Sequence, residues 1–239
     1  MKAVLLAAGR GSRLKHLTAQ TPKPLMSVGN ETCIDIVLRA LNVVVDEVVI
    51  VTGFQSQMIE QHLKDHPPKV AYKIVINPNP EKGNLTSLEA ARAEVEGHDF
   101  LLTNADHLFP ENFYTEHFYA SDGISVAGEN DREILDDEMK VVVDGENKLQ
   151  AMSKTLPVFD GTYIGTTRVP ASFSTVYWQA FDHVHANNDL TIACVENVLD
   201  HLAKEKTAIE VNWVKNVSWF EVDTAEDLTI AREGLVENV

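Results

Sequence analysis

Five charged residues in this sequence could together handle a polyphosphate. Arg10 and Arg13 stand in a stretch of small residues near the start, and Lys23 follows them between two prolines. Because proline fixes φ, the flanking prolines should hold Lys23 on a stiff segment. Asp106 and Asp223 lie far downstream, each just after an apolar run that is typical of a strand. Cations gathered around a flexible loop predict a site that binds a polyphosphate.

The stretch that contains the two arginines has the pattern of a buried strand followed by a glycine loop. Residues 3–6 are apolar, and Ala7, Ala8, Gly9 and Gly11 follow. Glycine lets a backbone approach a ligand closely, with its N–H groups free to point at it. The third glycine of the dinucleotide fingerprint is missing, which disfavours a nicotinamide oxidoreductase, and no Gly-Lys-Ser/Thr sequence completes a phosphate loop. A purely structural turn would use the same glycines, so the loop alone leaves both interpretations open.

Both carboxylates also have an ordinary structural alternative. Asp106 follows the apolar run 100–103 and could be a turn residue or a helix cap. Asp223 precedes a predicted helix, and Glu226 stands three residues later, as in a capping box. In open α/β sheets ligands bind beyond the carboxyl ends of the strands. We therefore expect Asp106 and the glycine loop to face the same crevice.

Composition and charge exclude several classes of function. Lys and Arg total 20 against 36 Asp and Glu, a net charge of −16, and so acidic a chain would repel a nucleic-acid backbone. No apolar run reaches the ~18–20 residues that span a bilayer, and no N-terminal signal is visible, so we expect no membrane insertion and a cytoplasmic protein. Cys33 and Cys194 show no metal-binding or disulfide pattern, and we expect them to be core thiols in apolar helical segments.

Hydrophobic periodicity predicts alternating strands and helices, as in a sheet wrapped by helices. Thr32 and Asp35 have the spacing of a capping box, so a helix should begin there and run to about Val45. Asp144 and Gly145 predict a hairpin turn. The other predicted helices are 55–63, 85–95, 172–185, 190–203 and 224 onward, and the predicted strands are 3–6, 47–51, 69–76, 100–103, 123–127, 139–143, 149–153, 162–169, 208–213 and 219–222.

The string LAAGRGSRL, followed by LT and then PKPL, resembles the signature of the nucleotidyltransferases that join a nucleoside triphosphate to a phosphorylated sugar or alcohol. The resemblance implies an α/β fold, a three-layer α/β/α sandwich with a mixed, mostly parallel central sheet. The segment Asp223–Asp227 resembles the Asp-Thr-x-Glu-Asp element of this superfamily, whose Asp is a metal ligand. Asn104–His107 departs from the usual Gly-Asp or Asp-Gly-Asp. The resemblance implies that Asp106 and Asp223 bind Mg²⁺, and that Arg13 and Lys23 hold the triphosphate.

The closer resemblance is to the cytidylyltransferases of phosphocholine, inositol phosphate and aminoalkylphosphonate. Besides the N-terminal signature, the segments that carry it are Glu81–Leu88, Asp137–Val141 with Ser153-Lys154, and Trp219–Asp227. It implies a Mg-dependent transferase that uses CTP and a small phosphorylated acceptor, and releases pyrophosphate. We expect one domain over 1–239, with the nucleotide-binding half at about 1–110 and the acceptor-binding half at about 111–239.

The expected site residues follow from the same pattern. Arg13, Lys23, Asp106 and Asp223 are expected to be catalytic, and Lys154 with Lys140 to bind the acceptor phosphate. Gly83, Asn84 and Ser87 could instead belong to an ordinary loop and helix cap. The expected nucleotide-binding residues are Leu6, Ala7, Ala8, Gly9, Gly11, Ser12, Arg13, Thr52, Gly53, Gly83, Asn84, Ser87 and Ala105.

Several alternatives stay open at this level. Asp136 and Glu138 could attract a choline or aminoethyl cation, whereas inositol would need neutral hydroxyl contacts. None of the nine histidines is assigned a catalytic role, because a phosphomonoester with a second pKa near ~6 is already mostly dianionic at neutral pH. Other functions on this fold are a sugar-1-phosphate nucleotidyltransferase that uses UTP, dTTP or GTP, and a catalytically silent nucleotide-sensing subunit. A homodimer is compatible with the sequence.

Overall fold

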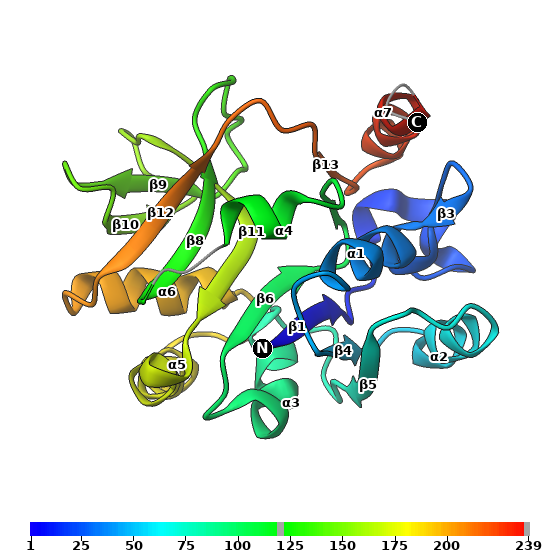
Figure 1. Cartoon of the computed structure of the whole chain (residues 1–239), viewed down its shortest axis with the longest axis horizontal. Helices are drawn as coiled ribbons and strands as arrows, with labels where there is room; N and C mark the ends of the chain where they lie inside the picture. Colours follow the sequence, from blue (N-terminus) through cyan, green and yellow to red (C-terminus); the bar gives the residue numbers. More distant parts are fainter. Residues whose placement is uncertain (119–121, 237–239) are drawn as a thin grey trace.

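A nine-stranded mixed sheet forms the centre of the protein, whose computed structural model describes residues 1–118 and 122–236 (Figure 1). Its strands are β1 (Lys2–Ala7), β4 (Glu47–Thr52), β5 (Ala71–Ile76), β6 (Phe100–Asn104), β8 (Ile124–Glu129), β9 (Lys140–Val143), β10 (Leu149–Ser153), β11 (Gly161–Val169) and β12 (Ile209–Val214). The order is β10-β9-β11-β6-β1-β4-β5, and β8 joins β11 to β12. Strands β6, β1, β4 and β5 run parallel, whereas β11 runs antiparallel to its neighbours β6, β8 and β9.

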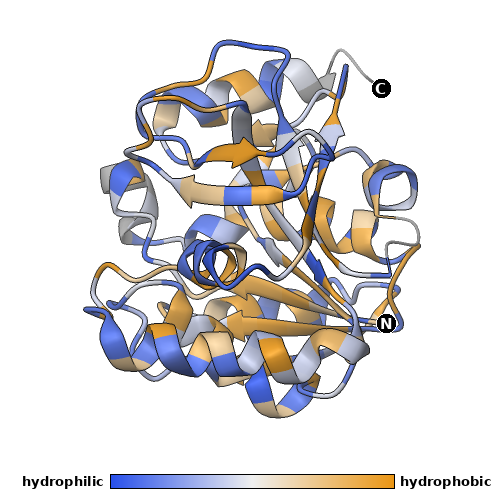
Figure 2. Cartoon of the chain, turned by 90° about the vertical axis from the view of Figure 1, so that its left-hand side faces the viewer, coloured by the Kyte–Doolittle hydropathy of each residue, from blue (hydrophilic) through white to orange (hydrophobic). Residues whose placement is uncertain are grey.

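Helices cover both faces of this sheet, as the three-layer prediction requires. The helices are α1 (Cys33–Leu41), α2 (Ser56–Asp65), α3 (Leu85–Val95), α4 (Phe113–His117), α5 (Ser174–Asn187), α6 (Val195–Lys204) and α7 (Ala225–Val236). The residues of β1 alternate between the two cores, because successive strand side chains point to opposite faces. Ala3 and Leu5 pack with α1, α2, α4 and α7, while Val4 and Leu6 pack with α3, α5 and α6. Hydrophobic colouring accordingly concentrates on the strands inside the molecule (Figure 2).

A small second sheet brings two distant segments together. β7 (His107–Leu108) pairs antiparallel with β13 (Phe220–Glu221), so that His107 lies opposite Glu221. The backbone N–H of Val222 donates to the carbonyl of Asp106 at 3.0 Å. This pairing places Asp106 and Asp223 beside each other, although 116 positions separate them in the sequence. The remaining short elements are a β2 (Ser27–Val28) and β3 (Glu31–Thr32) hairpin and the 3₁₀ turns η1 (Ser12–Ala19), η2 (Lys23–Leu25) and η3 (Ala171–Phe173).

Most predicted elements are present, and the differences have local causes. The capping box of Thr32 and Asp35 is confirmed, but α1 ends at Leu41, before the predicted Val45. The helix predicted over 190–203 begins only at Val195, with Cys194 as its N-cap residue. Before it, residues 189–193 form a turn in which the Asp189 carboxylate accepts from the N–H and the hydroxyl of Thr191. Cys33 is buried as expected, whereas Cys194 is half-buried at a helix start.

The predicted hairpin of β9 and β10 is confirmed, but its loop is longer than two residues. The Asp144 carboxylate accepts from the backbone N–H groups of Glu146 and Lys148. Asn147, not Gly145, takes the left-handed conformation at φ 59°. In the described part of the chain, no helix is both long enough and apolar enough to cross a membrane.

Candidate functional site

A cavity of about 1080 Å³ opens where β1 and β6 end, and residues from both halves of the chain line it. Leu6, Ala8, Gly9 and Arg13 come from the first strand and its loop, as predicted. The lining residues expected from the other predicted segments are Asn84, Ser87, Asp106, Glu138, Lys154 and Asp223. Those not assigned beforehand include His107, Glu129, Arg132, Glu196, Trp219 and Glu221.

The glycine loop packs directly on Lys23. Gly11 has φ 61°, and a Cβ at this position would lie 3.0 Å from the Lys23 Cβ. Only glycine therefore allows both the left-handed turn and this close approach. Ser12 is exposed beside it, while Ala7 and Ala105 are buried, and the N–H of Ala105 donates to the carbonyl of Leu6 at 3.0 Å. Ala7 and Ala105 thus anchor the ends of β1 and β6 below the cavity.

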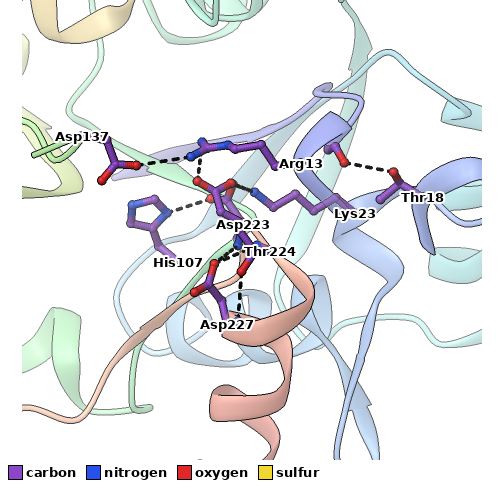
Figure 3. A network of polar contacts seen from close by, with 10 residues as sticks. Arg13, Thr18, Lys23, His107, Asp137, Asp223, Thr224 and Asp227 are labelled. Atoms are coloured by element: carbon purple, nitrogen blue, oxygen red, sulfur yellow. Dashed lines mark hydrogen bonds and ion pairs between the residues drawn. The ribbon is translucent and has the colours of Figure 1, made fainter. Parts of the chain in front are cut away.

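Lys23 joins the two predicted metal ligands. Its buried ammonium donates to Asp106 Oδ2 at 2.6 Å. It also donates to Asp223 Oδ1 (Figure 3). Burial alone would lower the pKa of Lys23, but the charges of Asp106 and Asp223 outweigh it and raise the pKa above its usual range. Burial likewise opposes ionisation of Asp106, yet the charge of Lys23 and the hydrogen bond from His107 hold the Asp106 pKa far below its ordinary value. Both groups are charged at neutral pH.

Arg13 links the same centre to the second half of the chain. Its guanidinium pairs with Asp223 and also lies 3.6 Å from Asp137 (Figure 3). Arg10, by contrast, is exposed and stands over the ring of Phe54, 5.3 Å from its centroid. The structure therefore brings Arg13 and Lys23 together with the carboxylates and leaves Arg10 at the surface of the loop.

Asp223 is not the N-cap of α7, because that role falls one residue later. The N–H of Asp227 donates to the Thr224 hydroxyl at 3.2 Å, and the Asp227 carboxylate accepts from the N–H groups of Thr224 and Asp223 at 2.7 and 3.1 Å (Figure 3). The predicted pair of Asp223 and Glu226 is therefore wrong as a capping box. Because Thr224 and Asp227 cap the helix, the Asp223 carboxylate is available to Lys23 and Arg13.

His107, for which the sequence suggested no partner, forms a wall of the cavity. Its Nδ1 lies 2.7 Å from Asp106 Oδ1, and its ring stacks on Trp219 with centroids 5.6 Å apart. Gly165, at φ 78°, supports the ring: a Cβ there would lie 2.4 Å from His107 Cδ2. Burial alone would lower the pKa of His107, but the hydrogen bond and charge of Asp106 raise it. His107 thus orients one of the two central carboxylates.

Glu221 adds a carboxyl group to the cavity lining, opposite His107 in the pairing of β7 with β13. Burial, opposed by the charge of His107, raises the pKa of Glu221 to about 7, and the neighbouring carboxylates Asp106 and Asp223 add to the rise. Its position follows from the pairing of β7 with β13, which the sequence alone did not indicate.

Near the start of α3, several polar groups already have partners in the protein. Asn84 Oδ1 accepts from the N–H of Val195 at 2.9 Å, and Ser87 Oγ accepts from Asn77 Nδ2 at 3.0 Å. The N–H of Gly83 donates to the carbonyl of Leu190 at 2.7 Å. Thr52 is fully buried, and Gly53 lies behind Pro80 and Ala8, which line the cavity. Thr52 and Gly53 therefore shape the site from one layer behind, rather than at its surface.

Lys140 does not lie where the sequence predicted. Its side chain is buried, and its ammonium donates to the carbonyls of Asp136 and Lys154 at 2.7 and 2.9 Å. Lys154 is exposed and lines the cavity. Lys140 therefore ties together the two segments that carry Asp136 and Lys154, and of the two lysines Lys154 is the one that lines the cavity.

A second cation between two carboxylates lies at this end of the cavity. Arg132 Nε donates to Glu129 Oε2 at 2.7 Å, and its terminal nitrogens donate to both oxygens of Glu138 at 2.9 and 2.5 Å. The Arg132 guanidinium stands 5.9 Å from the centre of the Trp219 ring, and Trp219 Nε1 donates to Glu129 Oε2 at 3.2 Å. No spacing in the sequence indicated this cluster, because its members come from β8, the loop after it and the segment before β13.

The two central carboxylates are suited to a hard divalent cation. Asp106 and Asp223 converge on one point, where the Lys23 ammonium now lies. Among the described residues, no group of three or more His, Cys, Asp or Glu side chains is arranged to hold a metal ion. Two carboxylates without a closed cage fit Mg²⁺ that completes its coordination with phosphate oxygens and water.

Comparison with known families agrees with this site. Residues 3–135 match the family described as "MobA-like NTP transferase domain". The chain belongs to this family. The matched residues include the glycine loop, Lys23 and Asp106. The family match therefore covers the part of the chain in which the sequence predicts a triphosphate site.

Similar proteins extend the likeness over the whole chain. This chain is 32% identical over 238 residues to the "Bifunctional IPC transferase and DIPP synthase" of Archaeoglobus fulgidus. The alignment covers 99% of this chain and 44% of that relative. The protein of the same name from Aquifex aeolicus is 30% identical over 98% of this chain and 52% of its own length. The chain thus spans about half the length of these relatives.

Solved structures share the fold of this NTP transferase. The inositol-1-phosphate CTP transferase from T. maritima superposes with a TM-score of 0.81 at 21% identity, covering 98% of this chain and 96% of the other. The CTP:phosphocholine cytidylyltransferase from Streptococcus pneumoniae gives 0.80 at 21% identity, with 98% of both chains covered. These likenesses confirm the predicted α/β fold class.

Proposed function

We propose that this NTP transferase is a cytidylyltransferase that joins CTP to a small phosphorylated alcohol and releases pyrophosphate. The observation that carries the proposal is the convergence of the glycine loop, Arg13 and Lys23 with Asp106 and Asp223 in one cavity. The choice of CTP and of an alcohol phosphate is supported by the names of the similar proteins. Residues 1–110 would hold the nucleotide and the rest of the chain the acceptor.

The triphosphate would lie along the glycine loop. Ala8, Gly9 and Arg13 of this loop line the cavity, and the Arg13 side chain is 57% exposed. When the triphosphate binds, the Lys23 ammonium would turn from the two carboxylates to phosphate oxygens. Asp106 and Asp223 would then need another cation to neutralise their negative charge. Mg²⁺ held by Asp106 and Asp223 would supply that charge and neutralise the departing pyrophosphate.

In the reaction an acceptor phosphate oxygen attacks the α-phosphorus of CTP, and the bond to the bridging oxygen of pyrophosphate breaks. No proton needs to be removed from a dianionic phosphate, so the chain's own task is positioning and charge stabilisation. Lys154, presented by Lys140, would hold the acceptor phosphate. His107, which is hydrogen-bonded to Asp106 and supported by Gly165, would keep that carboxylate in position.

The test is pyrophosphate release with CTP, UTP, dTTP and GTP, each paired with inositol phosphate, phosphocholine, 2-aminoethylphosphonate and glucose-1-phosphate. We expect the highest kcat/KM with CTP and an alcohol phosphate. A buried mismatch at the 4-position of the base costs on the order of 1–3 kcal/mol, so CTP should be preferred to UTP by about five- to a hundredfold. UTP with glucose-1-phosphate as the best pair would replace this function with sugar-1-phosphate nucleotidyl transfer. Absence of turnover with every pair, together with nucleotide binding, would indicate a silent sensor.

A further inference from the structure

We infer that Arg132 fills a place at the acceptor end that would otherwise bind a cationic headgroup, and that the site therefore selects a neutral polyhydric alcohol phosphate over a cationic alcohol phosphate. The inference rests on the proposed function for its substrate class. Its geometric basis is independent of that function, because the contacts of Arg132 are made within the protein itself.

The surroundings of Arg132 have the composition of a cation-binding cage. An indole face, Trp219, lies beneath the guanidinium at 5.9 Å, and the carboxylates of Glu129 and Glu138 flank it. An aromatic face with nearby carboxylates is the arrangement that recognises quaternary ammonium groups. Both carboxylate side chains are largely buried, at 10% and 16% exposure, so they would bind a cation strongly if Arg132 did not.

Arg132 is fixed in this place by nearly all of its donors. A guanidinium has five N–H groups. Four bonds are formed, one to Glu129, two to Glu138 and one to the carbonyl of Glu133 at 2.9 Å. Hydrogen bonding to Glu138 also raises the pKa of Arg132 above its already high value. The guanidinium is therefore permanently charged. A cationic substrate could reach Glu129 and Glu138 only by displacing the Arg132 side chain from them.

The occupied cage leaves groups that suit hydroxyls. A trimethylammonium group has no N–H or O–H donors and would meet the like charge of Arg132 where the indole face should be. A polyol can accept from the fifth N–H of Arg132 and donate to carboxylate oxygens of the same cluster, because hydroxyls act in both directions. The suggestion that Glu138 attracts a choline cation is thereby replaced: that carboxylate already has its cation.

The experiment compares kcat/KM for inositol phosphate and phosphocholine, with CTP, in the natural protein and in Arg132→Ala, Arg132→Gln and Arg132→Lys. We expect the phosphocholine-to-inositol-phosphate ratio to rise at least ~10-fold in Arg132→Ala and Arg132→Gln, and to stay near its natural value in Arg132→Lys. The matched control is Arg92→Ala. Arg92 also stands over an indole, Trp178 at 4.9 Å, between Glu96 and Asp182, but outside the cavity, so its ratio should not change.

A binding measurement separates this inference from the proposed function. Tetramethylammonium should bind to Arg132→Ala at least ~10-fold more tightly than to the natural protein or to Arg92→Ala, measured by calorimetry at matched ionic strength. If no variant turns over either acceptor, the proposed function is wrong and the tetramethylammonium affinities still decide the inference. Equal affinities for the natural protein and Arg132→Ala would overturn it, as would a natural preference for phosphocholine.

Discussion

Two cations at this cavity, Lys23 and Arg132, are each held between two carboxylates, yet we propose opposite roles for them. Lys23 bridges Asp106 and Asp223 at the end of the cavity beside the glycine loop, and Arg132 bridges Glu129 and Glu138 at the other end. Lysine is a compact point charge on a flexible stem, whereas arginine is a planar fork that locks into place and stacks on an aromatic ring. In the proposed function the lysine would leave its carboxylates to a metal ion and bind phosphate, while the arginine would remain a fixed part of the wall.

The largest difference should follow from removing the charges beside Lys23. We expect Asp106→Asn and Asp223→Asn each to lower kcat by more than about 100-fold, since loss of a metal ligand weakens charge neutralisation at the pyrophosphate. Turnover measured at raised Mg²⁺, with circular dichroism to check folding, tests this. Near-normal activity in either folded variant would remove that residue from the metal site and weaken the contrast with Arg132.

Replacing the cations of the glycine loop and Lys23 one at a time should lower kcat/KM by different amounts. Lys23→Ala and Arg13→Ala are expected to lower kcat/KM by about 10²–10³-fold, because each can neutralise triphosphate charge from a held position. Arg10→Ala, which removes an exposed side chain stacked on Phe54, should change it less than about threefold. Steady-state kinetics with CTP measures all three. Equal losses would indicate a diffuse basic surface and no defined cradle.

The His107 ring, which lies between the two clusters, can be shifted by a substitution that removes no charged side chain. In Gly165→Ala the new Cβ would approach the His107 ring to 2.4 Å, and φ 78° is unfavourable for alanine. We expect a loss of about 1–3 kcal/mol in the free energy of unfolding, together with lower kcat as His107 shifts away from Asp106. Urea unfolding and kinetics report the two effects. A loss of stability with unchanged kcat would show that the orientation of His107 does not matter for turnover.

The smallest expected effect concerns Asp35, the carboxylate of the α1 capping box, which lies outside the cavity. Burial alone would raise the pKa of Asp35, but hydrogen bonds from Thr32 and His62 lower it below its usual value. A carboxyl with a depressed pKa stabilises the fold above about pH 4, and this contribution is lost as the pH falls further. Asp35→Asn should therefore cost about 1 kcal/mol at pH 7 and much less at pH 3, as measured by urea unfolding, with unchanged kinetics. An equal cost at both pH values would contradict the role of the charge.

Much of the nucleotide end was predictable because its residues are close in the sequence. The strand, the glycine loop, Arg13 and the proline-flanked Lys23 occupy one stretch, and Asp106 follows the neighbouring parallel strand, so the rule for strand ends places it correctly. The mixed sheet with helices on both faces also follows from periodicity and resemblance. Lys140 was misplaced because a lysine flanked by apolar residues can turn its amine either to a ligand or to buried carbonyls, and only the register of β9 decides this.

The sequence by itself determined the fold class and the glycine loop, because these depend on local spacing and residue type, and it predicts which residues would hold phosphate and metal. Only the tertiary structure decided which charges meet. The pairing of β7 with β13 brings Asp223 to Asp106, Thr224 frees Asp223 by capping α7, and the segment before β13 carries Trp219 under Arg132. The pairing of β7 with β13 and the contact of Trp219 with Arg132 join residues roughly 90 to 120 positions apart. No local pattern specifies such a pairing, since it depends on how the strands and loops pack around one cavity.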